Sequence, residues 1–390
     1  MKIFRTMPLS RLLLFVTALV AVMVAGTVAV VARGGSGSTP PPQPLANAIH
    51  DALSAPQPEG ITARIEFTNK LFPSGALTGQ AGSALTSGAT GRLWANAHGG
   101  RLELQSDAGD TQITWTDTKV TVYDASSNTA YVADLPEHQD ASTQATDSIP
   151  TLDEITKFLT DAAQHWAVSD AVPSNVAGQE AYTVTISPKH DGGLLGSAEL
   201  AWDATHGTPL EVAVYAQGAS SPVLALRANE ITFGPVSDSD IAAGPPANVK
   251  IVDLSSHTTT SSGGTDTPPV TGLAAVKAAA PFAVAAPDTL VGLPLRDIRL
   301  VGPADSRAAL AVYGQGLGAI VVVERATDTS TSKSSGGLSS LPTISLDGVT
   351  AHELATQLGT ILSWDNAGVS YVLAGSVPSA AAESAARALK

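Results

Sequence analysis

Short segments with every second position apolar recur along this chain, and the clearest series lies between Gly178 and Val236. Its segments read AYTVTIS, SAELAWD, LEVAVYA, VLALRA and EITFGPV, and Gly, Pro, Asp and Asn stand in the breaks between them. This pattern predicts about five consecutive antiparallel strands with one apolar face. Six similar segments follow Gly60: ITARIEFTN, GRLWANA, GRLELQSD, TQITWTD, KVTVYD and TAYVADL.

Apolar residues at helical spacing occur in two places that flank the earlier group of strands. Residues 45–53 (LANAIHDAL) predict a short amphipathic helix, and residues 151–166 predict a longer one that ends at Trp166. Thr151 or Asp153 can cap the start of the longer helix. One face of each strand must be covered, so we expect an α+β fold in which a strongly curved antiparallel sheet wraps round helices.

The N-terminus predicts a membrane anchor. Lys2, Arg5 and Arg11 precede an uncharged apolar segment from Leu12 to Ala32, whose 21 residues span about 30 Å as a helix. The basic residues predict an inside N-terminus and an exported remainder. A cleaved signal peptide is the alternative, but its apolar core is usually shorter. We therefore expect a stub and anchor over residues 1–33 and a Gly/Pro linker over residues 34–44.

A polar segment rich in turn-forming residues, 253–273, predicts a linker between a first domain (45–252) and a smaller C-terminal α+β domain (274–390). In the latter, RAALAVY and AIVVVERA predict two strands joined by a glycine turn. PTISLDGVTAHELATQLGTILSW predicts a strand and a helix. Residues 365–389 predict a strand followed by a helix that Ser379 can cap, an ending that resembles C-terminal modules of exported bacterial regulators.

Composition narrows the function classes. The net charge of −14 and the pI near 4.9 disfavour nucleic-acid binding, because a diffuse acidic surface repels phosphate backbones. The chain has no cysteine, which excludes disulfides, thiolate metal sites, thiol catalysis and an acylated cysteine anchor.

Three motifs that suggest chemistry are better explained as structure. GQGLGA (314–319) has the letters of a dinucleotide-binding loop, but the strand-like IVVVE follows it where a helix is required, so we expect a hairpin turn. The eight histidines have no metal-ligand spacing. SDSD (237–240) is expected to be a solvated turn. We expect no cofactor, no metal and no catalytic residue.

Two segments carry a resemblance to a known family: residues 119–136, and the later succession G-x-x-x-Y, W-D, P-L-x-V and Y between Gly178 and Tyr215. With the helix between them they resemble the bacterial lipoprotein-carrier proteins of the LolA and RseB type, over residues 45–252. The resemblance implies an unclosed half-barrel whose concave apolar face accepts acyl chains, with helices as a lid.

YDASSNTAYV and WDATHGTPLEV use the same hairpin device twice. Asp124 and Asp203 end a strand and form the turn, and Asn128 or Gly207 supplies a residue that tolerates positive φ. Large aromatic side chains within the predicted strands are candidates for lining a lipid cavity, with ordinary core packing as the alternative for each. The candidates are Trp94, Trp115, Tyr123, Tyr131, Trp202, Tyr215 and Phe233.

The sequence thus predicts a membrane-anchored extracytoplasmic protein, not an enzyme, that binds lipid or lipoprotein acyl chains. The alternative is an envelope-stress sensor that contacts an anti-sigma factor or another membrane protein.

Overall fold

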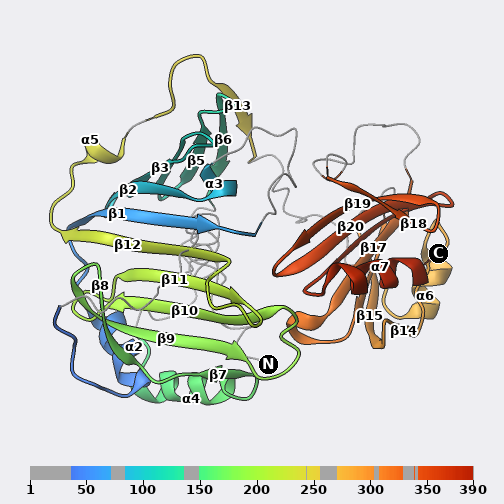
Figure 1. Cartoon of the computed structure of the whole chain (residues 1–390), viewed down its shortest axis with the longest axis horizontal. Coiled ribbons are helices and arrows are strands. Elements are labelled where there is room, and N and C mark those ends of the chain that lie inside the picture. The colour runs from blue at the N-terminus through green and yellow to red at the C-terminus, as the bar shows by residue number, and fades with distance from the viewer. Residues whose placement is uncertain are drawn as a thin grey trace.

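The computed structural model describes residues 37–71, 84–135, 149–242, 244–254, 270–302, 307–327, 338 and 341–389. Within these residues the chain forms two separate β-sheets, a large one at the N-terminal side and a smaller one at the C-terminal side (Figure 1). The predicted membrane segment, Leu12 to Ala32, lies outside the described residues. None of the helices within the described ranges is long and apolar enough to cross a membrane.

The first sheet has 13 strands in the order β13-β6-β5-β4-β3-β2-β1-β12-β11-β10-β9-β7, and β8 also pairs with β9. All of its pairings are antiparallel except the one between β13 and β6. The strands are β1 (Gly60–Asn69), β2 (Ala89–Asn96), β3 (Gly99–Gln105), β4 (Thr111–Thr116), β5 (Lys119–Asp124), β6 (Thr129–Asp134), β7 (Trp166–Val168), β8 (Val172–Val176), β9 (Gln179–Pro188), β10 (Leu195–Asp203), β11 (Pro209–Ala216), β12 (Leu224–Phe233) and β13 (Lys250–Asp253). The sheet is strongly curled (Figure 1), so the predicted half-barrel of an α+β fold is confirmed.

Two helices, α2 (Leu45–Ser54) and α4 (Leu152–Ala162), pack against one face of β9 and β10. Thr151 caps α4, because its Oγ1 accepts the N–H of Glu154 while the Glu154 carboxylate accepts the N–H of Thr151 at 2.8 Å. This reciprocal capping box fixes where the helix begins. A third helix, α3 (Ala84–Ser87), covers Phe67 and Leu104 on the same face.

The far end of α4 differs from the prediction. The helix stops at Ala162, and Trp166 lies in β7, where it pairs with Pro188 of β9. Strands β7 and β8, both on the edge of β9, were not predicted at all. The predicted turn at 237–240 is instead part of a short helix, α5 (Asp238–Ile241).

The segments VLALRA and EITFGPV form one strand, β12, and not two. The register with β1 shifts between Arg64 and Ile65, which pair with Glu230 and Ala228, so Asn229 is the extra residue of a β-bulge. A bulge disturbs the alternation of side chains as a turn would, but it leaves the strand continuous.

The repeated hairpin device is confirmed. The carboxylate of Asp124 accepts the N–H of Ser126 at 3.0 Å, and Asn128 has φ of 45°. The carboxylate of Asp203 accepts the N–H of His206 at 2.6 Å, and Gly207 has φ of 67°. Both aspartates are therefore turn formers.

The second sheet has eight antiparallel strands in the order β14-β15-β16-β17-β21-β20-β19-β18. They are β14 (Thr289–Leu290), β15 (Leu293–Val301), β16 (Ala308–Tyr313), β17 (Ile320–Ala326), β18 (Thr343–Leu346), β19 (Val349–Thr356), β20 (Gly359–Asn366) and β21 (Val369–Gly375). Two helices, α6 (Leu273–Ala279) and α7 (Ser379–Ala388), cover one face and share its apolar core.

Two predictions for this region are wrong. VTAHELAT was predicted within a helix, but it forms β19, because β18 and β20 pair with it on both sides. Pro378, and not Ser379, occupies the N-cap of α7. Ser379 is the first helical residue, and its hydroxyl donates to the carboxylate of Glu353.

Candidate functional site

The face of the first sheet on which α2 and α4 pack, here called the inner face, carries an unbroken apolar row across six strands. Directly opposed residues of antiparallel strands point to the same face. The register therefore places these side chains side by side: Val184, Leu200, Val212, Leu226, Phe67 and Ala89.

A second apolar row crosses the other half of the same face. It runs through eight neighbouring strands from β12 to β13 and consists of Ile231, Ala63, Leu93, Leu102, Ile113, Val122, Tyr131 and Val252. Neither row contains a charged side chain. The inner face is therefore a continuous apolar surface.

The opposite face, here called the outer face, is polar at the equivalent positions. One row there contains Glu211, Arg227, Glu66 and Thr90 on four consecutive strands. Arg227 Nε lies 3.7 Å from the Glu211 carboxylate. The contrast between the faces indicates that one binds water and the other an apolar partner.

Coverage of the inner face is uneven. Tyr182, Val184 and Trp202 are buried under α2 and α4. At the other end, Val122 of β5 is half-buried, and Tyr131 of β6 is 40% exposed. Between these ends Leu102 and Ile113 are buried, so the apolar rows become accessible only toward β5 and β6, where a ligand could reach them.

Four of the seven predicted aromatic residues lie on the inner face. Trp202 is buried under the helices, and Phe233 stacks on His206 with ring centroids 4.1 Å apart. Trp115 and Tyr131 lie in the less covered half, on β4 and β6. The structure therefore brings Trp115 and Tyr131 to one part of the apolar surface and places the other two nearer the helices.

The remaining three lie on the outer face. Trp94 stacks under the guanidinium of Arg101, 5.0 Å from the ring centroid. Tyr123 donates its hydroxyl to Asn128 at 3.2 Å. Tyr215 stands near two carboxylates, and burial, followed by these charges, raises its pKa to about 12. That any of the seven lines a lipid cavity stays a prediction.

Gly100 makes room for the indole of Trp115. A Cβ atom at Gly100 would lie 2.1 Å from Cζ2 of Trp115, far inside contact distance. The indole therefore lies against the backbone of β3, where any other residue would displace it.

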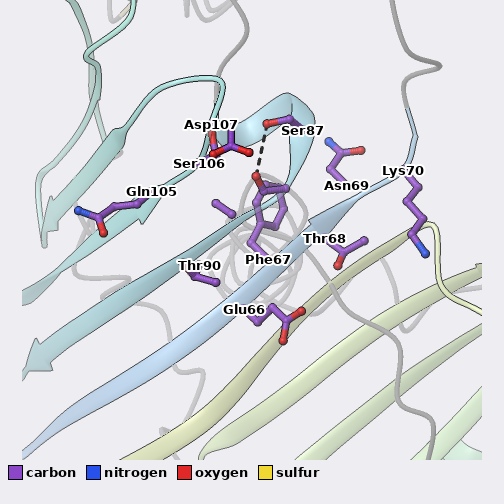
Figure 2. Close-up of a pocket in the computed structure, with 12 residues that line it drawn as sticks. Glu66, Phe67, Thr68, Asn69, Lys70, Ser87, Thr90, Gln105, Ser106 and Asp107 are labelled. Atoms are coloured by element: carbon purple, nitrogen blue, oxygen red, sulfur yellow. Dashed lines mark hydrogen bonds between the residues drawn. The ribbon is translucent and has the colours of Figure 1, made fainter.

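A cavity of about 450 Å³ lies where β1 ends, beside α3 and the start of β2 (Figure 2). Apart from Phe67, Gly88 and Ala89, its lining consists of polar side chains: Glu66, Thr68, Asn69, Lys70, Ser87, Thr90, Gln105, Ser106 and Asp107. This lining suits a polar or charged group and would not hold an alkyl chain.

The outer face of β10 and β11 carries two carboxyl groups, Glu199 and Glu211, whose pKa burial raises. The side chain of Glu211 is 2% exposed, and burial raises its pKa from 4.5 to about 7, while Arg227 opposes the rise and Glu199 adds to it. Burial also raises the pKa of Glu199. One carboxylate oxygen of Glu211 has no hydrogen-bond partner, which fits a carboxyl that keeps its proton near neutral pH.

Among the described residues, no group of three or more His, Asp and Glu side chains could hold a metal ion. GQGLGA forms the predicted turn between β16 and β17, with a single 3₁₀ turn at Gly316–Gly318.

Sequence reasoning missed the aliphatic residues that make up most of the inner face, such as Leu226, Leu102 and Val122. The sequence did contain a pattern that could have indicated them, since each stands at an apolar position of a segment in which apolar and polar residues alternate. Only the register between strands shows that these phases join into rows.

No known family model matches the chain, and no curated protein matches its sequence. Solved structures do match. MucB in complex with MucA(peri) is 14% identical over 88% of this chain and 96% of that one, with a TM-score of 0.42. The MucA/MucB complex of Pseudomonas aeruginosa is 14% identical over 87% of this chain and 95% of that one, with a TM-score of 0.41. A LolA superfamily protein from Nitrosomonas europaea is 7% identical over 52% of this chain and 98% of that one, with a TM-score of 0.22.

Proposed function

We propose that this chain is a membrane-anchored extracytoplasmic protein that binds the acyl chains of a lipid or lipoprotein on the inner face of its first sheet. The proposal rests on the two unbroken apolar rows of the inner face. Following the order of the sheet, these rows together cross β9, β10, β11, β12, β1, β2, β3, β4, β5, β6 and β13. An anchor at Leu12 to Ala32 would hold this surface close to the membrane that supplies the ligand.

The energetics favour an alkyl occupant. Each methylene group that leaves water for an apolar surface contributes about 0.8 kcal/mol, so an acyl chain of ordinary length can be held without any polar contact. The polar cavity at the end of β1, with Lys70 and Asp107 in its lining, offers hydrogen-bonding groups for the headgroup. Along its two rows the inner face supplies one such group, the hydroxyl of Tyr131.

Tryptophan fluorescence tests the proposal, because a brominated acyl chain quenches an indole that it touches. Trp115 lies on the inner face and Trp94 on the outer face of a nearby strand. We expect a brominated fatty acid to quench the wild-type protein. Trp115→Phe should remove most of that quenching, and Trp94→Phe should leave it in place.

A matched pair of polar substitutions supplies the control. Val122 lies on the inner face and its neighbour Thr121 on the outer face, and both are half-buried. Val122→Asp should abolish acyl binding while Thr121→Asp retains it. Equal quenching in all variants, or no acyl ligand in the mass spectrum of gently extracted protein, would refute the proposal.

A second candidate function is contact with a membrane protein, such as an anti-sigma factor. The observation that favours it is the strand β13 at the edge of the first sheet, where Ile251 is 65% exposed and the following Leu254 is 41% exposed. Exposed edge strands bind extended segments of other chains. Crosslinking in membranes from a cysteine placed at Ile251 should then capture one protein, and recovery of uncrosslinked protein alone would exclude this candidate.

A further inference from the structure

The second sheet also has an apolar surface that its helices do not cover. In the described residues α6 and α7 pack on one face, together with Leu362 and Leu373. The alternate residues point to the opposite face, here called the bare face. One row of this face runs across five strands through Val312, Val321, Ala374, Ile361 and Leu354. All five are half-buried.

Polarity on the bare face changes along the strands. At the far end of the same strands, the corresponding row contains Arg325, Ser370, Asp365 and Thr350. A face that met only water would be polar along its whole length. The apolar character begins at the strand ends that adjoin the first sheet and extends on β16, β17 and β21 to the next row, Leu310, Val323 and Val372, which locates the occupant on the half of the face nearer the first sheet.

Hydrogen bonds hold these strand ends against the first sheet (Figure 1). Gln357, in the β19–β20 turn, donates to the carbonyl of Lys70 at the end of β1 at 3.1 Å. In the β9–β10 turn, Asp191 accepts the N–H of Gly318 at 2.7 Å and the side chain of Gln315 at 2.8 Å. The GQGLGA turn is thus one part of the junction between the sheets, together with the β19–β20 turn.

The bare face and the inner face lie on the same side of this junction. In a strand of L-residues, the face to which a side chain points fixes the direction of its own N–H and C=O groups. By the alternation of β1, the position of Lys70 belongs to the outer face. Its N–H donates to the carbonyl of Val223, just before β12, and so points toward β12. Glu353, on the helix-covered face of β19, directs its N–H toward β18. At the junction the end of β1 meets the β19–β20 turn, and the β9–β10 turn meets the β16–β17 turn. With the sheets joined in this order, the two N–H directions place the outer face of the first sheet and the helix-covered face of the second sheet on one side. The inner face and the bare face therefore lie together on the other side.

We propose that the apolar row of the bare face is a second binding surface for acyl chains, continuous with the inner face across the junction. This inference rests on the proposed function and extends its site to the second sheet. Five strands spaced about 4.8 Å apart give a strip roughly 20 Å long, which Leu310, Val323 and Val372 widen to two side chains on three of the strands. That strip is far smaller than the roughly 800 Å² per partner of a stable protein interface, and it fits one alkyl chain.

Site-specific labels test the second surface separately from the first. The chain has no cysteine, so Ile361→Cys can carry a fluorophore on the apolar row, and Thr350→Cys can carry the same label at the polar end of the same face. We expect an acyl chain with a nitroxide near its end to quench the label at position 361 but not at position 350. In the same titration Trp115 should be quenched.

The outcomes separate the two proposals. Quenching of Trp115 without quenching at position 361 would overturn the second surface and leave the proposed function standing, and quenching at neither site would overturn both. A dimer in light scattering without ligand, with the label at position 361 protected, would show that a second copy covers the face and would also overturn the inference. Val321→Ser, a milder change, should weaken acyl binding about fivefold without removing the quenching of Trp115.

Discussion

Glu211 of β11 is a carboxyl group buried on the outer face of the first sheet. Its side chain is 2% exposed, one of its oxygens has no hydrogen-bond partner, and Arg227 approaches the other only to 3.7 Å. A buried carboxylate with so little compensation is costly. We therefore predict that Glu211→Gln, which keeps the shape and removes the charge, stabilises the protein above neutral pH.

The magnitude follows from the pKa. A rise from 4.5 in the unfolded chain to about 7 in the folded state, at about 1.4 kcal/mol per pKa unit, corresponds to about 3 kcal/mol. Between pH 4.5 and 7 the folded state holds a proton that the unfolded state has lost, so stability falls as the pH rises through this window. Above pH 7 the loss is complete. The pKa of about 7 already includes the attraction between Arg227 and the carboxylate, so we expect Glu211→Gln to be about 3 kcal/mol more stable than the wild type at pH 8.

Thermal unfolding between pH 4.5 and 8.5 measures this effect. For a domain of this size, 1 kcal/mol shifts Tm by about 2–4 °C. The wild type should lose stability between pH 4.5 and 7 more steeply than Glu211→Gln, and the two curves should meet near pH 4.5. Glu230→Gln is the control, since the Glu230 side chain is 68% exposed and its pair with Arg64 contributes about 0–1 kcal/mol. Parallel curves for wild type and Glu211→Gln would refute the reasoning.

Two further predictions concern residues that shape the inner face and helix α4, which packs on it. Gly100→Ala should displace the indole of Trp115, because its Cβ would lie 2.1 Å from the ring. We expect the maximum of the tryptophan fluorescence emission to shift. An unchanged emission spectrum together with wild-type stability would contradict this prediction. Thr151→Ala removes the capping box of α4 and should cost about 1 kcal/mol, measured by denaturant unfolding. Thr151→Ser should restore most of it, and equal losses in both variants would argue against the cap.

Local patterns in the sequence were sufficient to predict most strands and helices of the first sheet and its surroundings. The Thr151 and Glu154 pair marks the start of α4, and aspartate turns mark two hairpins. Pairing between distant segments decided the rest. Trp166 fits a helical period, but its segment pairs with β9, some twenty residues further along. VTAHELAT has helix-forming residues, yet pairing on both edges makes it a strand, because tertiary context overrides propensity.

The candidate site was harder to predict because it depends on register. Trp94 and Trp115 both stand in alternating segments, and nothing local shows that they point to opposite faces. A shift of one residue in pairing exchanges the two faces of a strand. The apolar phase was readable in each strand, but its continuity from Val184 to Val252 follows only from the pairings.

The two faces of the first sheet can be tested against each other, because their chemistry is separate. Glu211 and Arg227 lie on the outer face, and Val122 and Trp115 lie on the inner face several strands away. Substitutions at distant sites without shared partners act independently. Glu211→Gln should therefore change the pH dependence of unfolding and leave the quenching of Trp115 by brominated acyl chains unaltered. Val122→Asn should abolish the quenching and, because it adds no titratable group, leave the shape of the pH dependence as in the wild type. If Glu211→Gln also abolished acyl binding, the ligand would have to contact the outer face, and the assignment of the inner face as the binding surface would be wrong.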